Sequence, residues 1–96
     1  MISKSAVVVA TKEQVSSDLE GEAVILNLKN GMYYGLDAIG SRIWELLQQP
    51  QSVAALRDAI MAEYDVDAER CERDLLALLN NLAEVQLIEV SDVAAA

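Results

Sequence analysis

The sequence predicts an α+β fold in which a three-stranded antiparallel sheet is followed by three helices. Turn signals and β-branched runs are concentrated before residue 37. After residue 37, apolar residues recur every three or four positions, which is the helical period. A chain of 96 residues buries roughly two thirds of the surface that it exposes when unfolded, enough for one core. We therefore expect a single domain over residues 1–96, with a folded core at about residues 6–90.

The first strands are predicted from composition and turn residues. Residues 6–10 (AVVVA) form a short β-branched run and are the first candidate strand. Residues 13–19 alternate weakly and fit either a strand or a loop. Glu20 and Gly21 then mark a break, and residues 22–29 (EAVILNLK) read as a clear strand.

The next strand is predicted by the Asn30-Gly31 pair, a strong signal for a two-residue hairpin turn. Residues 32–36 (MYYGL) return antiparallel, and the turn would place Lys29 opposite Met32 and Leu28 opposite Tyr33. One face of this hairpin is expected to be buried; its residues are Val24, Leu26, Leu28 and Tyr33. The other face is partly apolar and is expected either to be covered by the first strand or a terminus, or to dock an incoming segment; its residues are Ile25, Asn27, Met32 and Tyr34.

Three helices follow, each with a candidate N-cap: Asp37, Ser52 and Asp67. Pro50 closes the first helix, and the third extends to about Val85. The expected inward positions are Ile39, Ile43, Leu46 and Leu47 in the first helix, then Val53, Leu56, Ala59 and Ile60, then Cys71, Leu75, Leu78, Leu79 and Leu82. Residues 86–90 (QLIEV) are a candidate last strand. A small sheet packed on three helices in this order is winged-helix-like.

Charge and composition narrow the class of partner. The formal net charge is −9, which disfavours binding to nucleic acid and to anionic lipid. No run approaches the roughly 20 apolar residues of a membrane helix, and the first residues do not resemble a signal peptide. Cys71 is the single cysteine, so no internal disulfide is expected. We expect a cytoplasmic protein whose partner is a peptide or another protein.

Catalytic and metal sites are not expected. The chain has no histidine, so neither a Ser-His-Asp nor a Cys-His arrangement can form. Cys71 lies within the apolar stripe of the third helix and is interpreted as a buried small hydrophobe. Asp65, Asp67 and Glu69 have the start of a calcium loop but lack its glycine and closing glutamate, so a capped, solvated helix start is favoured. We predict a protein that is not an enzyme and needs no cofactor or metal.

Two apolar side chains have both a structural and a functional interpretation. Trp44 is one position off the stripe of its helix and is favoured as a core residue sealing the edge between sheet and helices. Leu76 lies away from the stripe of the third helix, near Arg73 and Asn80. It is either an ordinary exposed leucine or part of a groove beside a strand edge.

The sequence resembles the PqqD-like family. The resemblance spans residues 23–90 and is carried by residues 33–37 (YYGLD), Gly40 and residues 43–47 (IWELL). Further matching positions are Ile60, Tyr64, Asp74-Leu75, Leu79, Leu82 and Leu87-Ile88. This family includes the recognition elements that bind leader segments of ribosomally made, post-translationally modified peptides.

The resemblance implies a function and a site. In the family the leader adds as a β-strand to the edge of the third strand, against the third helix, and is presented to a modifying enzyme or a leader protease. The sequence pattern of residues 33–47 is closer to that of recognition proteins in lasso-peptide biosynthesis. The alternative is a peptide chaperone for a radical SAM enzyme in quinone-cofactor or other peptide maturation. The expected peptide-binding residues are Met32, Tyr33, Tyr34, Gly35 and Leu36 on the strand, and Arg73, Leu76, Ala77 and Asn80 on the helix. If the other flank of the helix faces the strand, Arg70, Asp74 and Ala77 would contact the peptide instead.

Two other functions remain to be separated from this one. A winged-helix DNA-binding regulator would need a basic recognition helix, but acidic residues outnumber Arg70 and Arg73 over residues 67–85. A structural subunit would keep its strand edge covered by a partner or by its own copy. Such a homodimer is compatible with peptide binding.

Overall fold

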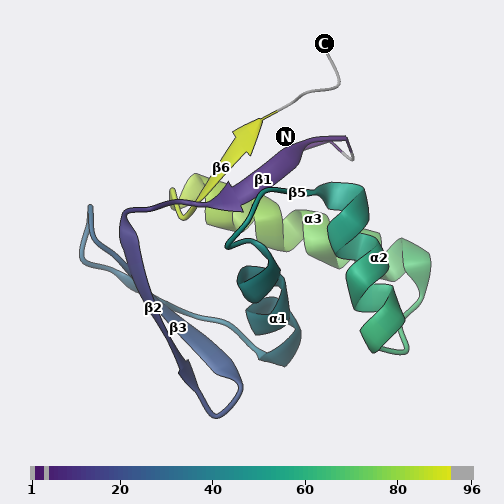
Figure 1. Ribbon diagram of the computed structural model, residues 1–96, viewed down its shortest axis with the longest axis horizontal. Coiled ribbons are helices and arrows are strands. Elements are labelled where there is room, and N and C mark those ends of the chain that lie inside the picture. The colour runs from purple at the N-terminus through teal and green to yellow at the C-terminus, as the bar shows by residue number, and fades with distance from the viewer. Residues whose placement is uncertain (1, 4, 92–96) are drawn as a thin grey trace.

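The computed structural model describes residues 2–3 and 5–91, and its strands form two small sheets that pack with three helices (Figure 1). The α+β class and the three-helix core predicted from sequence are confirmed. The folded core was expected to end at about residue 90; a strand extends it to Ser91, and residues 92–96 lie outside the described residues.

The first sheet joins the two ends of the chain. It has the order β5-β1-β6, with β1 at Val7–Ala10, β5 at Gln51–Ser52 and β6 at Ile88–Ser91. Both outer strands pair antiparallel with β1. The first and last predicted strands are therefore confirmed, but they form a sheet of their own rather than extending the hairpin.

The second sheet is a meander of order β2-β3-β4. Strand β2 covers Gln14–Leu19, so the ambiguous segment is a strand, and β3 covers Glu22–Asn27. A two-residue turn joins them, in which Glu20 and Gly21 both have positive φ, 57° and 85°. The Asp18 carboxylate supports this turn by accepting a 2.8 Å bond from the Gly21 amide.

The predicted register of the next hairpin is wrong. Strand β4, Tyr33–Gly35, pairs Tyr33 with Leu26, which is two residues away from the predicted partner. Residues 28–31 form the loop, because the Asn27 amide donates to the Met32 carbonyl. Side chains hold this longer loop: Asn27 accepts a bond from the Lys29 amide at 2.8 Å and Asn30 accepts one from Met32 at 2.9 Å.

The predicted buried face of this hairpin is also wrong. Ile25 is fully buried and Asn27 is 2% exposed, whereas Tyr33 is 70% exposed on the opposite face. Asn27 tolerates burial because its side-chain amide donates to the carbonyl of Val85 at 2.9 Å. A polar residue with satisfied hydrogen bonds thus belongs to the core face.

The helices begin where their caps predict. Helix α1 is Ala38–Leu46, α2 is Val53–Glu63 and α3 is Ala68–Glu84. The N-cap side chain of each helix accepts one bond from the backbone amide three residues later, at 2.8 Å for Asp37, 3.0 Å for Ser52 and 3.1 Å for Asp67.

The core lies between the helices and the inner faces of both sheets. Trp44 is 3% exposed and Ile43 is also buried, as predicted, but Ile39 is 36% exposed and lies at the margin. The most buried large side chains are Ile25, Leu47, Leu56, Leu79, Leu87, Val8 and Val53.

Candidate functional site: an open strand edge beside α3

The free edge of β4 is the first feature of the candidate site. Within residues 5–91, β4 pairs with β3 alone, so its other side has no strand partner. Such an edge leaves a row of backbone groups available to another chain.

The hydrogen bonds to β3 show which groups point outward. The Met32 carbonyl accepts from Asn27, and the Leu36 amide donates to Ala23, so both residues bond inward. Antiparallel pairs alternate, so the residue between them, Tyr34, also bonds toward β3. Tyr33 and Gly35 consequently direct their N–H and C=O groups away from the sheet, into the open edge.

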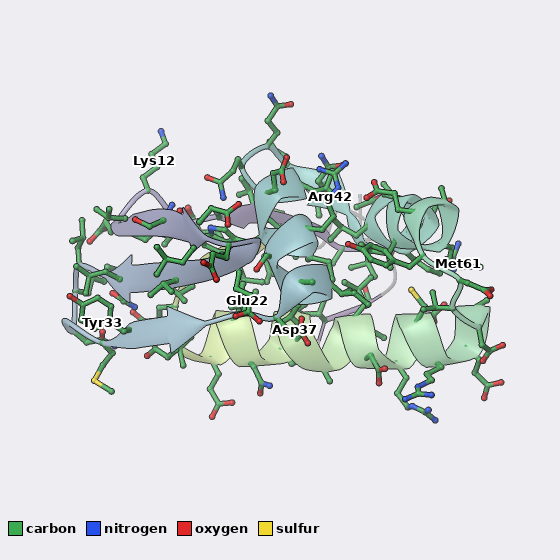
Figure 2. The ribbon with its side chains drawn as sticks, turned by 90° about the horizontal axis from the view of Figure 1, so that it is seen from below. Lys12, Glu22, Tyr33, Asp37, Arg42 and Met61 are labelled. Atoms are coloured by element: carbon green, nitrogen blue, oxygen red, sulfur yellow. The ribbon has the colours of Figure 1, made fainter. Side chains whose placement is uncertain are left out.

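A cavity of about 670 Å³ adjoins the end of β4. Figure 2 shows the segment from Tyr33 to Asp37 running alongside α3, and Gly35 and Leu36 line this cavity together with residues of α3. Most of its lining is apolar: Leu36, Ile39, Gly40, Ile43, Ile60, Val66, Cys71, Leu75 and Leu78. An extended peptide on the β4 edge could therefore place an apolar side chain here.

The rim of the cavity is acidic. Asp37, Asp65, Asp67 and Asp74 contribute to it, and the one basic side chain in the lining is Arg70. The Arg70 guanidinium lies 3.7 Å from the Asp74 carboxylate, and both side chains are well exposed. This charge distribution disfavours an acidic guest side chain at this position.

The flank of α3 that lies toward β4 is the one with Arg70 and Asp74, rather than the one with Leu76 and Asn80. Arg70 and Asp74 share the cavity with Gly35 and Leu36. On the other flank, the Asn80 side chain accepts a bond from the Ile2 amide and donates to the Leu76 carbonyl. Asn80 on that flank therefore contacts the N-terminal segment, and Leu76 is half-buried against the core.

The remaining predicted residues divide between two environments. Arg73 and Ala77 are exposed on α3 and are absent from the cavity lining. Tyr34 is half-buried and packs against the core, so it supports β4 from within. Met32 and Tyr33 are exposed, at 55% and 70%.

The outer face of the meander, turned away from the helices, is apolar. Val15, Leu26 and Tyr33 stand in one row across the three strands. Leu19, at the end of β2, is 60% exposed, and Leu28 is 56% exposed. Exposed apolar side chains gathered in this way are typical of an interaction surface.

Cys71, which lines the cavity, is a buried free thiol. Burial raises the pKa of the Cys71 thiol, which lowers its reactivity as a nucleophile. Among the described residues there is no group of three or more histidine, cysteine or acidic side chains placed to hold a metal. None of the described helices has the length and hydropathy needed to cross a bilayer.

Comparison with known proteins places this geometry in a family. The family model described as coenzyme PQQ synthesis protein D (PqqD) matches residues 22–88. The chain belongs to the PqqD family. No curated protein sequence matches the chain significantly.

Two solved structures are similar to this PqqD-family chain. One is TbiB1 in complex with the TbiA(beta) leader peptide, at 44% identity and a TM-score of 0.79, covering 84% of this chain and 94% of that one. The other is lasso peptide synthetase B1 complexed with the leader peptide, at 24% identity and a TM-score of 0.75, covering 85% of this chain and 96% of that one. At that identity the second match speaks for the fold alone.

Sequence reasoning missed several residues that line the cavity in this PqqD-family chain. Ile39 lies at the start of α1, and Asp65 and Val66 lie in the connection between α2 and α3. Ile39 was expected to point inward, and its 36% exposure places it at the margin of the core, beside the cavity. No local pattern indicates that these segments meet.

Proposed function

We propose that this protein binds the leader segment of a ribosomally made precursor peptide by β-strand addition to β4, and holds it without reacting with it. The observation that carries the proposal is the pair of outward-facing residues, Tyr33 and Gly35, at an open edge that ends in an apolar cavity. The TbiB1 structure, a leader-peptide complex of a chain 44% identical to this one, supports it.

Backbone pairing supplies the affinity in this arrangement. An extended guest can exchange hydrogen bonds with the N–H and C=O of Tyr33 and of Gly35, because neither residue uses them within the sheet. Successive guest side chains point to opposite faces, so alternate residues lie toward α3 or toward the outer face.

Selectivity comes from the cavity. Its apolar floor, which includes Leu36 and Leu78, favours an aliphatic or aromatic guest side chain. The carboxylates of Asp65 and Asp74 at the rim disfavour an acidic one. We therefore place the selective contact on the flank of Arg70 and Asp74 rather than at Arg73.

The outer face supports presentation of the leader to a second protein. Tyr33 belongs both to the open edge, through its backbone, and to the apolar face, through its side chain. A modifying enzyme or leader protease docked on this face would lie directly beside the bound leader. We assign the pathway to lasso-peptide biosynthesis; a radical SAM enzyme as the recipient is the alternative.

Fluorescence anisotropy with a labelled leader tests the proposal. The probe is the leader of the precursor peptide encoded beside this protein, and the control is a scrambled peptide of the same composition. We expect a Kd of about 1 μM or tighter for the leader alone. Equal binding of both peptides, or no binding of the leader at about 100 μM, would refute the proposal.

A further inference from the structure

The opposite edge of the same sheet, formed by β2, is also open. In the part of the chain that the structure describes, β2 pairs with β3 alone. All its residues except Gln14 are exposed. Figure 2 shows β2 near Lys12, on the side of the sheet away from α3 and from the proposed leader edge.

This edge has little of the usual protection against pairing. Edge strands in soluble proteins are commonly blocked by charged side chains, especially lysine, by proline or by a bulge. The sequence of β2, QVSSDL, contains neither lysine nor proline and one charged residue, Asp18, and it pairs with β3 without interruption from Gln14 to Leu19. An edge of six residues with one charge is suited to pairing with another strand in a register that separates that charge from its copy.

The outward-facing groups of β2 can be assigned from its bonds to β3. The Leu28 amide donates to the Glu13 carbonyl at 3.1 Å, so odd-numbered residues of this strand bond inward. Gln14, Ser16 and Asp18 consequently present their N–H and C=O groups to the open edge.

We propose that a second copy of this chain pairs with β2, antiparallel, about a two-fold axis at Ser16. This register places Ser16 opposite Ser16 and Gln14 opposite Asp18, with the outward-facing groups of both copies in line. Each of the three pairs exchanges two backbone hydrogen bonds, about six in all. The alternative centred on Ser17 aligns fewer outward-facing residues of β2.

Charge favours the same register. Asp18 is the one charged residue of β2, and the two-fold axis at Ser16 places it opposite Gln14, four positions along the strand from the Asp18 of the other copy. An axis at Ser17 would bring the two Asp18 residues to diagonal positions, where like charges repel each other more strongly.

The dimer leaves the proposed leader site free. The joined sheet has the order β4-β3-β2-β2-β3-β4, so both β4 edges lie at its two ends. The outer apolar faces of the two copies become one continuous surface. Dimerisation and leader binding therefore use different edges and can be abolished separately.

The strength of this dimer depends on salt. Two chains of net charge −9 repel each other, and the repulsion extends about 30 Å at 0.01 M salt but only about 8 Å at 0.15 M. A single strand pair is a small interface, so we expect half-association near 100 μM at 0.15 M salt and weaker association at 0.01 M.

Sedimentation velocity of the full chain from about 5 μM to about 1 mM tests the proposal. We expect the average mass to rise from 10.4 kDa toward twice that value with concentration and with salt. Ser16→Pro removes an outward N–H that makes no bond to β3, and it should remain monomeric while still binding the leader. Ser16→Thr keeps the N–H and should dimerise as the wild type does.

Three results would overturn the proposal. A wild-type chain that stays monomeric throughout the concentration range has no such interface. A dimer that persists in Ser16→Pro uses another surface, such as the outer face. A dimer that is lost in Gly35→Pro, or displaced by leader, uses β4 instead.

Discussion

Replacing Gly35 by proline removes one backbone donor from the β4 edge and leaves the rest of the sheet intact. The Gly35 amide points outward and makes no bond to β3. Gly35 has no positive φ, and a Cβ added there meets nothing within 4 Å. Tyr34, which precedes it, is in a strand and already has the extended conformation that proline requires of its neighbour.

The expected loss follows from one missing hydrogen bond in a covered interface. A guest carbonyl that loses its donor is left covered and unsatisfied, which costs about 1–3 kcal/mol. This range corresponds to a Kd for Gly35→Pro that is roughly 5- to 150-fold weaker than that of the wild type.

Leader anisotropy measures this loss, and Gly35→Ala is the matched control because it adds a side-chain carbon but keeps the N–H. We expect Gly35→Ala to bind within about twofold of wild type. Circular dichroism and thermal unfolding establish that Gly35→Pro remains folded. A folded Gly35→Pro variant with wild-type affinity would refute strand addition at β4.

Three further predictions concern the loop, an ion pair and the outer face. Asn27→Ala leaves the Lys29 amide and the Val85 carbonyl without this partner, and should lower the free energy of unfolding by about 1–3 kcal/mol, measured by urea denaturation; an unchanged midpoint would contradict the account of the buried Asn27. The hydrogen bond from Arg42 lowers the pKa of Glu63, so this pair stabilises the fold above the unfolded pKa of glutamate and loses its effect as pH falls through the lower folded value. The difference in Tm between wild type and Arg42→Met should therefore shrink on acidification from about pH 7 to below about pH 4, and a constant difference would contradict it. Tyr33→Asp should keep leader affinity within about threefold but reduce processing by the recipient enzyme at least tenfold, measured as leader cleavage or modification; unimpaired processing would remove the outer face from the account.

Local sequence signals located the helices correctly. Asp37, Ser52 and Asp67 begin the three helices because a cap depends on its own side chain and on amides two or three residues ahead. The stripe of α3 likewise gave its buried residues, since Leu75 and Leu79 follow the helical period.

Contacts between residues far apart in the sequence determine the two features that local patterns did not predict: the buried face of β3 and the flank of α3 that faces β4. The buried face of β3 is set by Asn27, whose partner Val85 lies 58 residues away. An asparagine in an alternating strand otherwise indicates the solvent side. The flank of α3 that faces β4 was undetermined for the same reason, because the packing of Ile2 near Asn80 has no local signature.

The two-residue turn was predicted at the wrong pair for a similar reason. Asn30-Gly31 has the stronger intrinsic preference, but Asn27 and Asn30 side chains bond to the loop backbone and hold a longer connection. Glu20-Gly21 has the two-residue turn instead, with Asp18 supporting it.

Amide hydrogen exchange of Tyr33, Tyr34 and Gly35, with and without leader, tests the central claim most directly. Without leader, the Tyr33 and Gly35 amides should exchange rapidly, whereas Tyr34 is slowed by its bond to β3. Saturating leader should slow Tyr33 and Gly35 together and leave the amides at the β2 edge unchanged. Tyr33 and Gly35 amides that stay fast in the saturated complex, or that are already slow in the free monomer, would contradict it.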